Sequence, residues 1–256
     1  SELSVLHSST STTSNPQTLS DSQLQTLITN LNQKLETNIT VNITTKHISN
    51  LNKITSFYNF ASYTLMVIIL FVTCLINASF NKPELKKRPL VSSLPLKRYN
   101  SSLLLSNCLF SLVVFLIFLG SGFLVAGETM LTPFSLLYLS VFAFFTFCCI
   151  TLAELIANLT TSKNAISGIV NLVSLGSAFL SGAFIPANFL PTFVLNFAHI
   201  LPSYWLINTN NKIQYLEDFN LNSISSLLPN CFMLIFFSIL FIILNHFLTK
   251  KKRKTS

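Results

Sequence analysis

The sequence is short of charged residues, and this shortage decides its class. Asp, Glu, Lys and Arg make up 9% of the 256 residues, whereas 50% are hydrophobic. A soluble domain carries about 25% charged residues, so the chain cannot supply the polar shell of a globular protein. The composition argues against soluble enzymes, nucleic-acid readers and disordered proteins, and it predicts an integral membrane protein.

Several patterns that carry chemistry are also missing. The six glycines form no G-x-x-x-x-G-K-[ST] motif, so the chain has no P-loop with which to hydrolyse ATP. There is no H-E-x-x-H motif, and the five cysteines form no C-x-x-C pair. We interpret these cysteines as small apolar fillers. The sequence therefore predicts no catalytic residue, metal site or cofactor, and a chain that is not itself an enzyme.

Five apolar stretches are long enough to cross about 30 Å of hydrocarbon as helices. They predict an all-α membrane protein with five transmembrane helices, at residues 57–79, 102–126, 134–157, 165–185 and 230–249. The fourth stretch carries a ladder of small residues, Ser174, Ala178 and Gly182. Such a ladder lets helix backbones approach closely, so we expect this face to pack within the bundle or against a second subunit.

The cationic residues are sorted between the two sides of these stretches. Twelve of the 16 Lys and Arg lie in loop 80–101, at Lys163 or in the tail 250–256, and the other four lie in residues 1–56 or at Lys212. Basic residues near span ends stay cytoplasmic. We therefore expect a multi-pass cell-membrane protein with a cytoplasmic loop and tail, and we interpret the net charge of +8 without any nucleic-acid partner.

The segments on the other side are then extracytoplasmic. Residues 1–20 are polar and predicted to be disordered, 21–37 show helical periodicity, and 38–45 give a weak strand signal. In the region 186–229, the apolar run between Pro191 and Pro202 is too short to span. It predicts an interfacial or re-entrant helix with Tyr204 and Trp205 at headgroup depth, or alternatively a buried loop helix.

Two features left alternatives open. The basic loop (Lys82, Glu84, Lys86, Lys87, Arg88, Lys97 and Arg98) could anchor to anionic membrane lipid or dock a cytoplasmic partner, and charge alone favours the lipid. Glu154 is the acidic residue inside a predicted span. An intramembrane carboxylate is a functional candidate, but its place near a span end favours an interfacial residue that reaches headgroup water.

Residues 164–205 resemble the type 2 ABC transporter permease family. The resemblance rests on Leu-Ser-Gly-Ala-Phe-Ile-Pro ending at Pro186, on Phe-Leu-Pro ending at Pro191, and on Leu-Pro-Ser-Tyr-Trp ending at Trp205. It implies a bacterial exporter subunit with six spans, of which the first would precede this chain. It also implies a homodimer or heterodimer that works with a separate cytoplasmic ATPase.

The resemblance shifts the expected role of the basic loop from lipid anchoring toward docking of the ATPase. We therefore expect outward transport of a hydrophobic or amphipathic substrate, such as a peptide, lipid or drug. Spans 57–79 and 165–185 would line the subunit interface, and segment 186–205 would gate the outer exit through Pro186, Pro191, Pro202, Tyr204 and Trp205. The competing hypotheses are a secondary transporter or channel, and a membrane scaffold that transports nothing.

Overall fold

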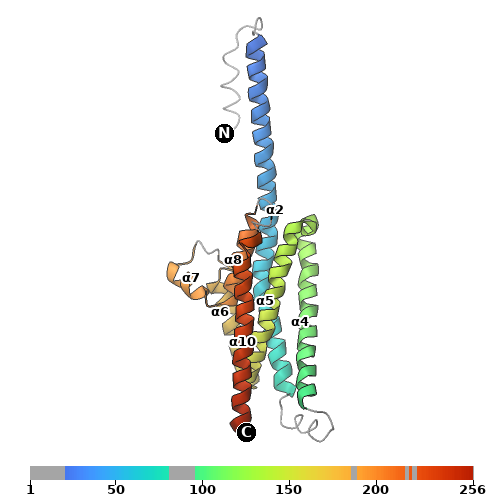
Figure 1. Ribbon diagram of the computed structural model, residues 1–256, viewed down its shortest axis with the longest axis vertical. Coiled ribbons are helices and arrows are strands. Elements are labelled where there is room, and N and C mark those ends of the chain that lie inside the picture. The colour runs from blue at the N-terminus through green and yellow to red at the C-terminus, as the bar shows by residue number, and fades with distance from the viewer. Residues whose placement is uncertain (1–20, 81–95, 186–188, 217–218, 221–223, 256) are drawn as a thin grey trace. The chain divides into compact units, whose positions relative to one another are not determined.

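A computed structural model describes residues 21–80, 96–185, 189–216, 219–220 and 224–255, and these form helices and no strand. By its internal contacts the chain divides into two compact units, Ser1–His47 and Ile48–Ser256. The expected disordered segment 1–20 lies outside the described residues. The second unit contains residues 48–80 of the first long helix and all of the helices that follow it (Figure 1).

Helix α2 (Asp21–Phe80) begins where the sequence predicted a helix, at Asp21. It continues through residues 38–45, so the strand predicted there is wrong. The alternation of Ile and Val with polar residues was short, and a lone strand has no ladder of hydrogen bonds to join. The described residues contain no second strand that could pair with it.

Among the described residues, four helices are long and apolar enough to cross a membrane, which confirms the all-α membrane fold. These stretches are Leu51–Phe80, Ser101–Leu131, Pro133–Leu159 and Leu228–Lys251. They belong to α2, to α4 (Leu96–Ala126) with the 3-10 turn η1 (Gly127–Leu131), to α5 (Pro133–Leu159) and to α10 (Leu228–Thr255). Four of the five predicted spans are therefore present.

The remaining predicted span, 165–185, is a helix only as far as Leu180, so its predicted end is wrong. Helix α6 (Lys163–Leu180) has 18 residues, which gives a length of about 27 Å. The helix ends because Gly182 adopts a positive φ of 87°, and the Ala183 N–H donates to the Ala178 carbonyl at 3.0 Å. This is the left-handed glycine cap that closes many helices.

Helix α5 lies at the centre of the bundle (Figure 1). Thr55 of α2 meets Tyr138, and Asn77 of α2 meets Glu154, so α2 and α5 run in parallel. In the most apolar stretch of α2 and of α5, half of the residues are buried inside the protein, whereas only 17% are buried in the corresponding stretches of α4 and α10. The last two helices thus lie at the periphery of this chain.

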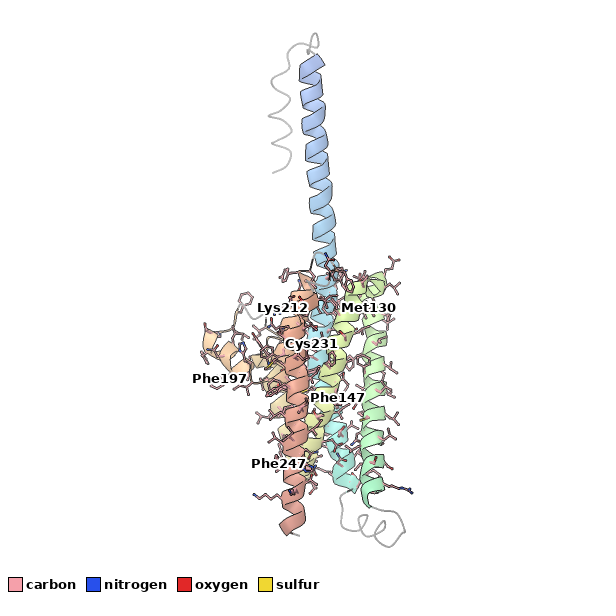
Figure 2. The ribbon with its side chains drawn as sticks, viewed as in Figure 1. Met130, Phe147, Phe197, Lys212, Cys231 and Phe247 are labelled. Carbon is pink, nitrogen blue, oxygen red and sulfur yellow. The ribbon has the colours of Figure 1, made fainter. Side chains whose placement is uncertain are left out.

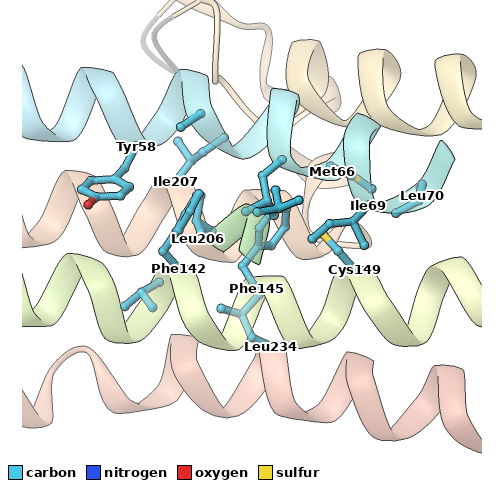
Figure 3. Close-up of a cluster of buried hydrophobic side chains, with 14 of the residues drawn as sticks. Tyr58, Met66, Ile69, Leu70, Phe142, Phe145, Cys149, Leu206, Ile207 and Leu234 are labelled. Carbon is cyan, nitrogen blue, oxygen red and sulfur yellow. The ribbon is translucent and has the colours of Figure 1, made fainter. Parts of the chain in front are cut away.

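The core between α2, α4 and α5 is built on aromatic rings. Tyr58 is fully buried, with its ring centroid 6.1 Å from that of Tyr138 and 5.0 Å from that of Phe142. Figure 3 shows Phe142 and Phe145 of α5 facing Leu206 and the helix α2. Aromatic pairs at these distances contribute about 0.5–1.5 kcal/mol beyond their burial, so this ring cluster fixes how the helices pack.

The outside of the unit is apolar as well. Phe147, Phe197 and Phe247 are all more than two-fifths exposed and lie on the periphery (Figure 2). Exposed aromatic residues at this density would be an aggregation hazard in water. They suit a surface that faces lipid.

Two short helices follow α6 in the chain. Helix α7 (Thr192–Ala198) precedes α8 (Pro202–Gln214), which begins with a proline in its first turn. Ser203 of α8 contacts Ser181 at the end of α6, whereas Asn210 of α8 contacts α2. Ser203 and Asn210 lie two turns apart on α8, a distance of about 10 Å. Helix α8 therefore runs from the end of α6 to a contact with α2, and it extends the crossing that α6 begins. Helices α6 and α8 therefore form one broken crossing.

A close approach of α2 and α4 yields a test of this packing. A Cβ at Gly122 would lie 2.9 Å from Tyr58 Oη and 3.1 Å from Met130 Cε, whereas one at Gly120 would meet nothing. We expect Gly122→Ala to lower stability by about 1–3 kcal/mol, because the buried ring of Tyr58 has no room to move. Gly120→Ala is the matched control, since both gain the same helix propensity. Equal thermal midpoints in detergent would contradict this.

Candidate functional site

The most unusual polar group in the bundle is the carboxylate of Glu154 on α5. Asn107 Nδ2 of α4 donates to Glu154 Oε1 at 2.7 Å, and Asn77 Nδ2 of α2 donates to Oε2 at 3.2 Å. Both asparagines are buried and Glu154 is half-buried. Each carboxylate oxygen therefore receives one amide hydrogen from a different helix. We call these three residues the carboxylate clamp.

The clamp joins the two helices that flank segment 81–95. Asn77 lies in the last turn of α2, and α4 begins at Leu96 on the other side of that segment. A typical intramolecular hydrogen bond contributes about 0.5–1.5 kcal/mol to stability. The two bonds thus connect α2 and α4 to α5.

Unpaired polar atoms occur on the same two helices as the amides of the clamp. Asn107 Oδ1, Thr73 Oγ1 and Ser111 Oγ are buried without a hydrogen-bond partner among the described residues. Thr73 lies one turn from Asn77 on α2, and Ser111 lies one turn from Asn107 on α4. Buried polar atoms need partners, so this part of the bundle has spare hydrogen-bonding capacity.

A second polar cluster holds α8 against α2. Asn210 Nδ2 donates to Asn59 Oδ1 at 2.9 Å, and Asn59 Nδ2 donates to Asn211 Oδ1 at 3.1 Å. The hydroxyls of Ser181 and Ser203 are 2.7 Å apart, and both residues are buried. The broken crossing is thus held at both ends of α8 by side-chain hydrogen bonds.

The turn between α7 and α8 is held by aromatic contacts. The His199 ring centroid lies 4.2 Å from that of Tyr204, and the Trp205 ring is 5.5 Å from Tyr204. Trp205 Nε1 also donates to the His199 carbonyl at 3.0 Å. These contacts fix the direction in which α8 leaves the turn.

Only some of the site residues predicted from the sequence lie among the described residues. Lys82, Glu84, Lys86, Lys87 and Arg88 of the basic loop lie outside the described residues, as does Pro186. Lys97 and Arg98 lie in the first turn of α4, and Arg98 is exposed.

The other predicted residues fall on α6, α7 and α8. Ser174 and Ala178 are buried on α6, and Gly182 lies beyond the end of that helix, as its cap. Pro191 precedes α7, and Pro202 opens α8. Tyr204 and Trp205 are half-buried in the aromatic turn.

Sequence analysis missed the partners of Glu154. A search for opposite charges does not find them, because the partners are asparagines, neutral donors that suit a carboxylate in an apolar bundle. The signal was an asparagine among apolar neighbours in each of two predicted spans, Asn77 and Asn107. Intramembrane amides commonly bond across helices, so both asparagines were candidate partners of Glu154, although the sequence does not show which helices are neighbours.

The comparisons with known proteins gave one result. A family model described as "ABC-2 family transporter protein" matches residues 1–247, nearly the whole chain. No curated protein and no solved structure gave a significant match.

The clamp yields a second prediction. Glu154→Leu should lower stability by about 1–3 kcal/mol for each amide left unpaired, because Asn77 and Asn107 remain buried. Replacing all three residues with Leu should recover most of this loss, since removing both partners of a buried bond is nearly neutral. Thermal unfolding in detergent measures both variants. A triple variant no more stable than Glu154→Leu would show that the two bonds contribute nothing.

Proposed function

Because the chain belongs to the ABC-2 transporter family, as a membrane-spanning permease subunit of an ABC transporter, we propose that it exports its substrate outward. The proposal rests on the family match over residues 1–247. The substrate is hydrophobic or amphipathic, a peptide, lipid or drug, because the crossing helices are apolar. The cytoplasmic membrane of a bacterium is the proposed location.

ATP is hydrolysed by a separate cytoplasmic ABC ATPase in this proposal. The ATPase docks on the basic loop that joins α2 to α4 in the sequence and carries Lys82, Lys86, Lys87, Arg88, Lys97 and Arg98. The carboxylate clamp supports this role, since it ties both flanking helices to the central α5. A push on the loop would move the three helices together.

A dimer of two permease subunits, identical or different, provides the translocation path. On α6 the residues Ile166, Val170 and Ser174 are buried within this chain, whereas Leu172, Leu175 and Phe179 are exposed. The exposed face of α6 is the surface that we propose for the second subunit. This refines the sequence-based expectation, because Ser174 and Ala178 pack inside the chain.

The outer gate is formed by the break between α6 and α8. Pro202, Tyr204 and Trp205 hold the start of α8, and the Ser181–Ser203 contact holds it against α6. Separating these two serines would free α8 to swing away from α6. Release of substrate would follow that motion.

A charge reversal tests the docking loop. Lys86→Glu with Lys87→Glu and Arg88→Glu should abolish copurification of the ATPase and ATP-driven export, because like charges would then meet at the contact. Reversing Lys250 and Lys251 in the tail is the matched control and should leave both unchanged. ATPase binding that survives the loop reversal would place the docking site elsewhere. Export that survives vanadate would instead favour a secondary transporter or channel.

A reversible cross-link tests the gate. With Ser181→Cys and Ser203→Cys, oxidation should join α6 to α8, because the two hydroxyl oxygens are 2.7 Å apart. We expect the export rate to fall at least tenfold, which corresponds to a rise of about 1.4 kcal/mol or more in the activation free energy. Reduction with dithiothreitol should restore the original rate. Each single variant is the control. Full export from the quantitatively oxidised double variant would exclude this gate.

A further inference from the structure

A cavity of about 290 Å³ lies between α5 and α10. Its floor includes Val141 of α5 and Leu227 just before α10, both buried. Its rim includes Phe144 and Phe232, both at least 39% exposed. The cavity is therefore a recess in the outer surface of the bundle, open between two helices that cross the membrane.

The lining offers almost nothing to a polar ligand. Apart from Ser140 it consists of apolar side chains, and the Ser140 hydroxyl already donates to the Leu137 carbonyl at 2.8 Å. Small-molecule sites normally contain a few polar groups that orient the ligand. A recess without them recognises shape and hydrocarbon only, and apolar cavities of this kind do not hold water.

The recess lies within one leaflet of a membrane. It extends over residues 137–144 of α5, which begins at Pro133, and over 228–235 of α10, which begins at Leu228. Each stretch is about 10 Å long, against about 15 Å for half of the hydrocarbon core. Both helices run the same way, so the recess opens to the leaflet in which they begin.

We propose that this recess binds one acyl chain of a membrane lipid from that leaflet. The surrounding medium is hydrocarbon, and an unfilled recess would leave its lining without dispersion contacts. A volume of about 290 Å³ is at the lower limit for drug-sized ligands, which suits a single chain and excludes a whole lipid. The site is independent of transport, since it requires only that α5 and α10 cross the membrane.

Photolabelling of the full chain tests the site. The protein is reconstituted in phosphatidylcholine vesicles whose lipid carries a diazirine on one acyl chain, irradiated, digested and mapped by mass spectrometry. Label per exposed apolar residue should be severalfold higher in 137–144 and 228–235 than on the exposed face of α4 at Leu105, Leu109 and Leu116. This comparison uses the unaltered chain, so it needs no variant to fold.

Two variants of α5 complete the test. Ser140→Phe places a ring in the recess and should reduce its labelling to the level of α4. Leu136→Phe is the matched control, since Leu136 is 64% exposed on the same helix but does not line the recess. Equal labelling of all exposed helices would indicate ordinary boundary lipid and overturn the proposal. Cross-links between two copies of the chain at the recess would also overturn it. Loss of export in either variant bears on neither outcome.

Discussion

Hydrocarbon offers no hydrogen-bond partner, and this constraint governs where polar side chains occur in the bundle. Every backbone polar group inside a crossing helix must be satisfied by the protein, and a buried polar side chain is costly unless it finds a partner there. Glu154 satisfies its two oxygens with amides from two neighbouring helices, and Asn59 does the same for its amide group with α8. The same few polar residues therefore hold the helices together. Separating these helices would break the hydrogen bonds and leave polar groups without partners. The clamp and the Ser181–Ser203 contact are the two connections that lie beside the proposed docking loop and the proposed gate.

Much of the fold could be predicted because a long apolar run has few structural alternatives in a membrane. The structure contains the four predicted spans 57–79, 102–126, 134–157 and 230–249 within longer helices. Wherever a span ends because the sequence becomes polar, its predicted end lies within about six residues of the helix end. Helix α2 exceeds its predicted span at the amino end because it continues as a polar helix, which hydropathy does not detect.

The broken crossing and the clamp escaped prediction for different physical reasons. The end of α6 depends on a backbone torsion at Gly182, and the apolar residues after it kept the hydropathy high although the helix had ended. The clamp depends on which helices are neighbours, so it needs the tertiary arrangement of α2, α4 and α5. Local periodicity can place Asn77, Asn107 and Glu154 on helices, but it does not show that the three residues meet.

The break between α6 and α8 also has an electrostatic consequence. The carboxyl end of α6, with its partial negative charge, meets the amino end of α8, with its partial positive charge. Ser203 in the first turn of α8 donates to the Ser177 carbonyl at 3.4 Å, and the same carbonyl accepts the Ser181 N–H at the end of α6. The opposite partial charges at these two helix ends attract each other most strongly where the dielectric constant is low. Without this arrangement, the break would expose two partially charged helix ends to lipid. Because the two ends face each other, their partial charges compensate.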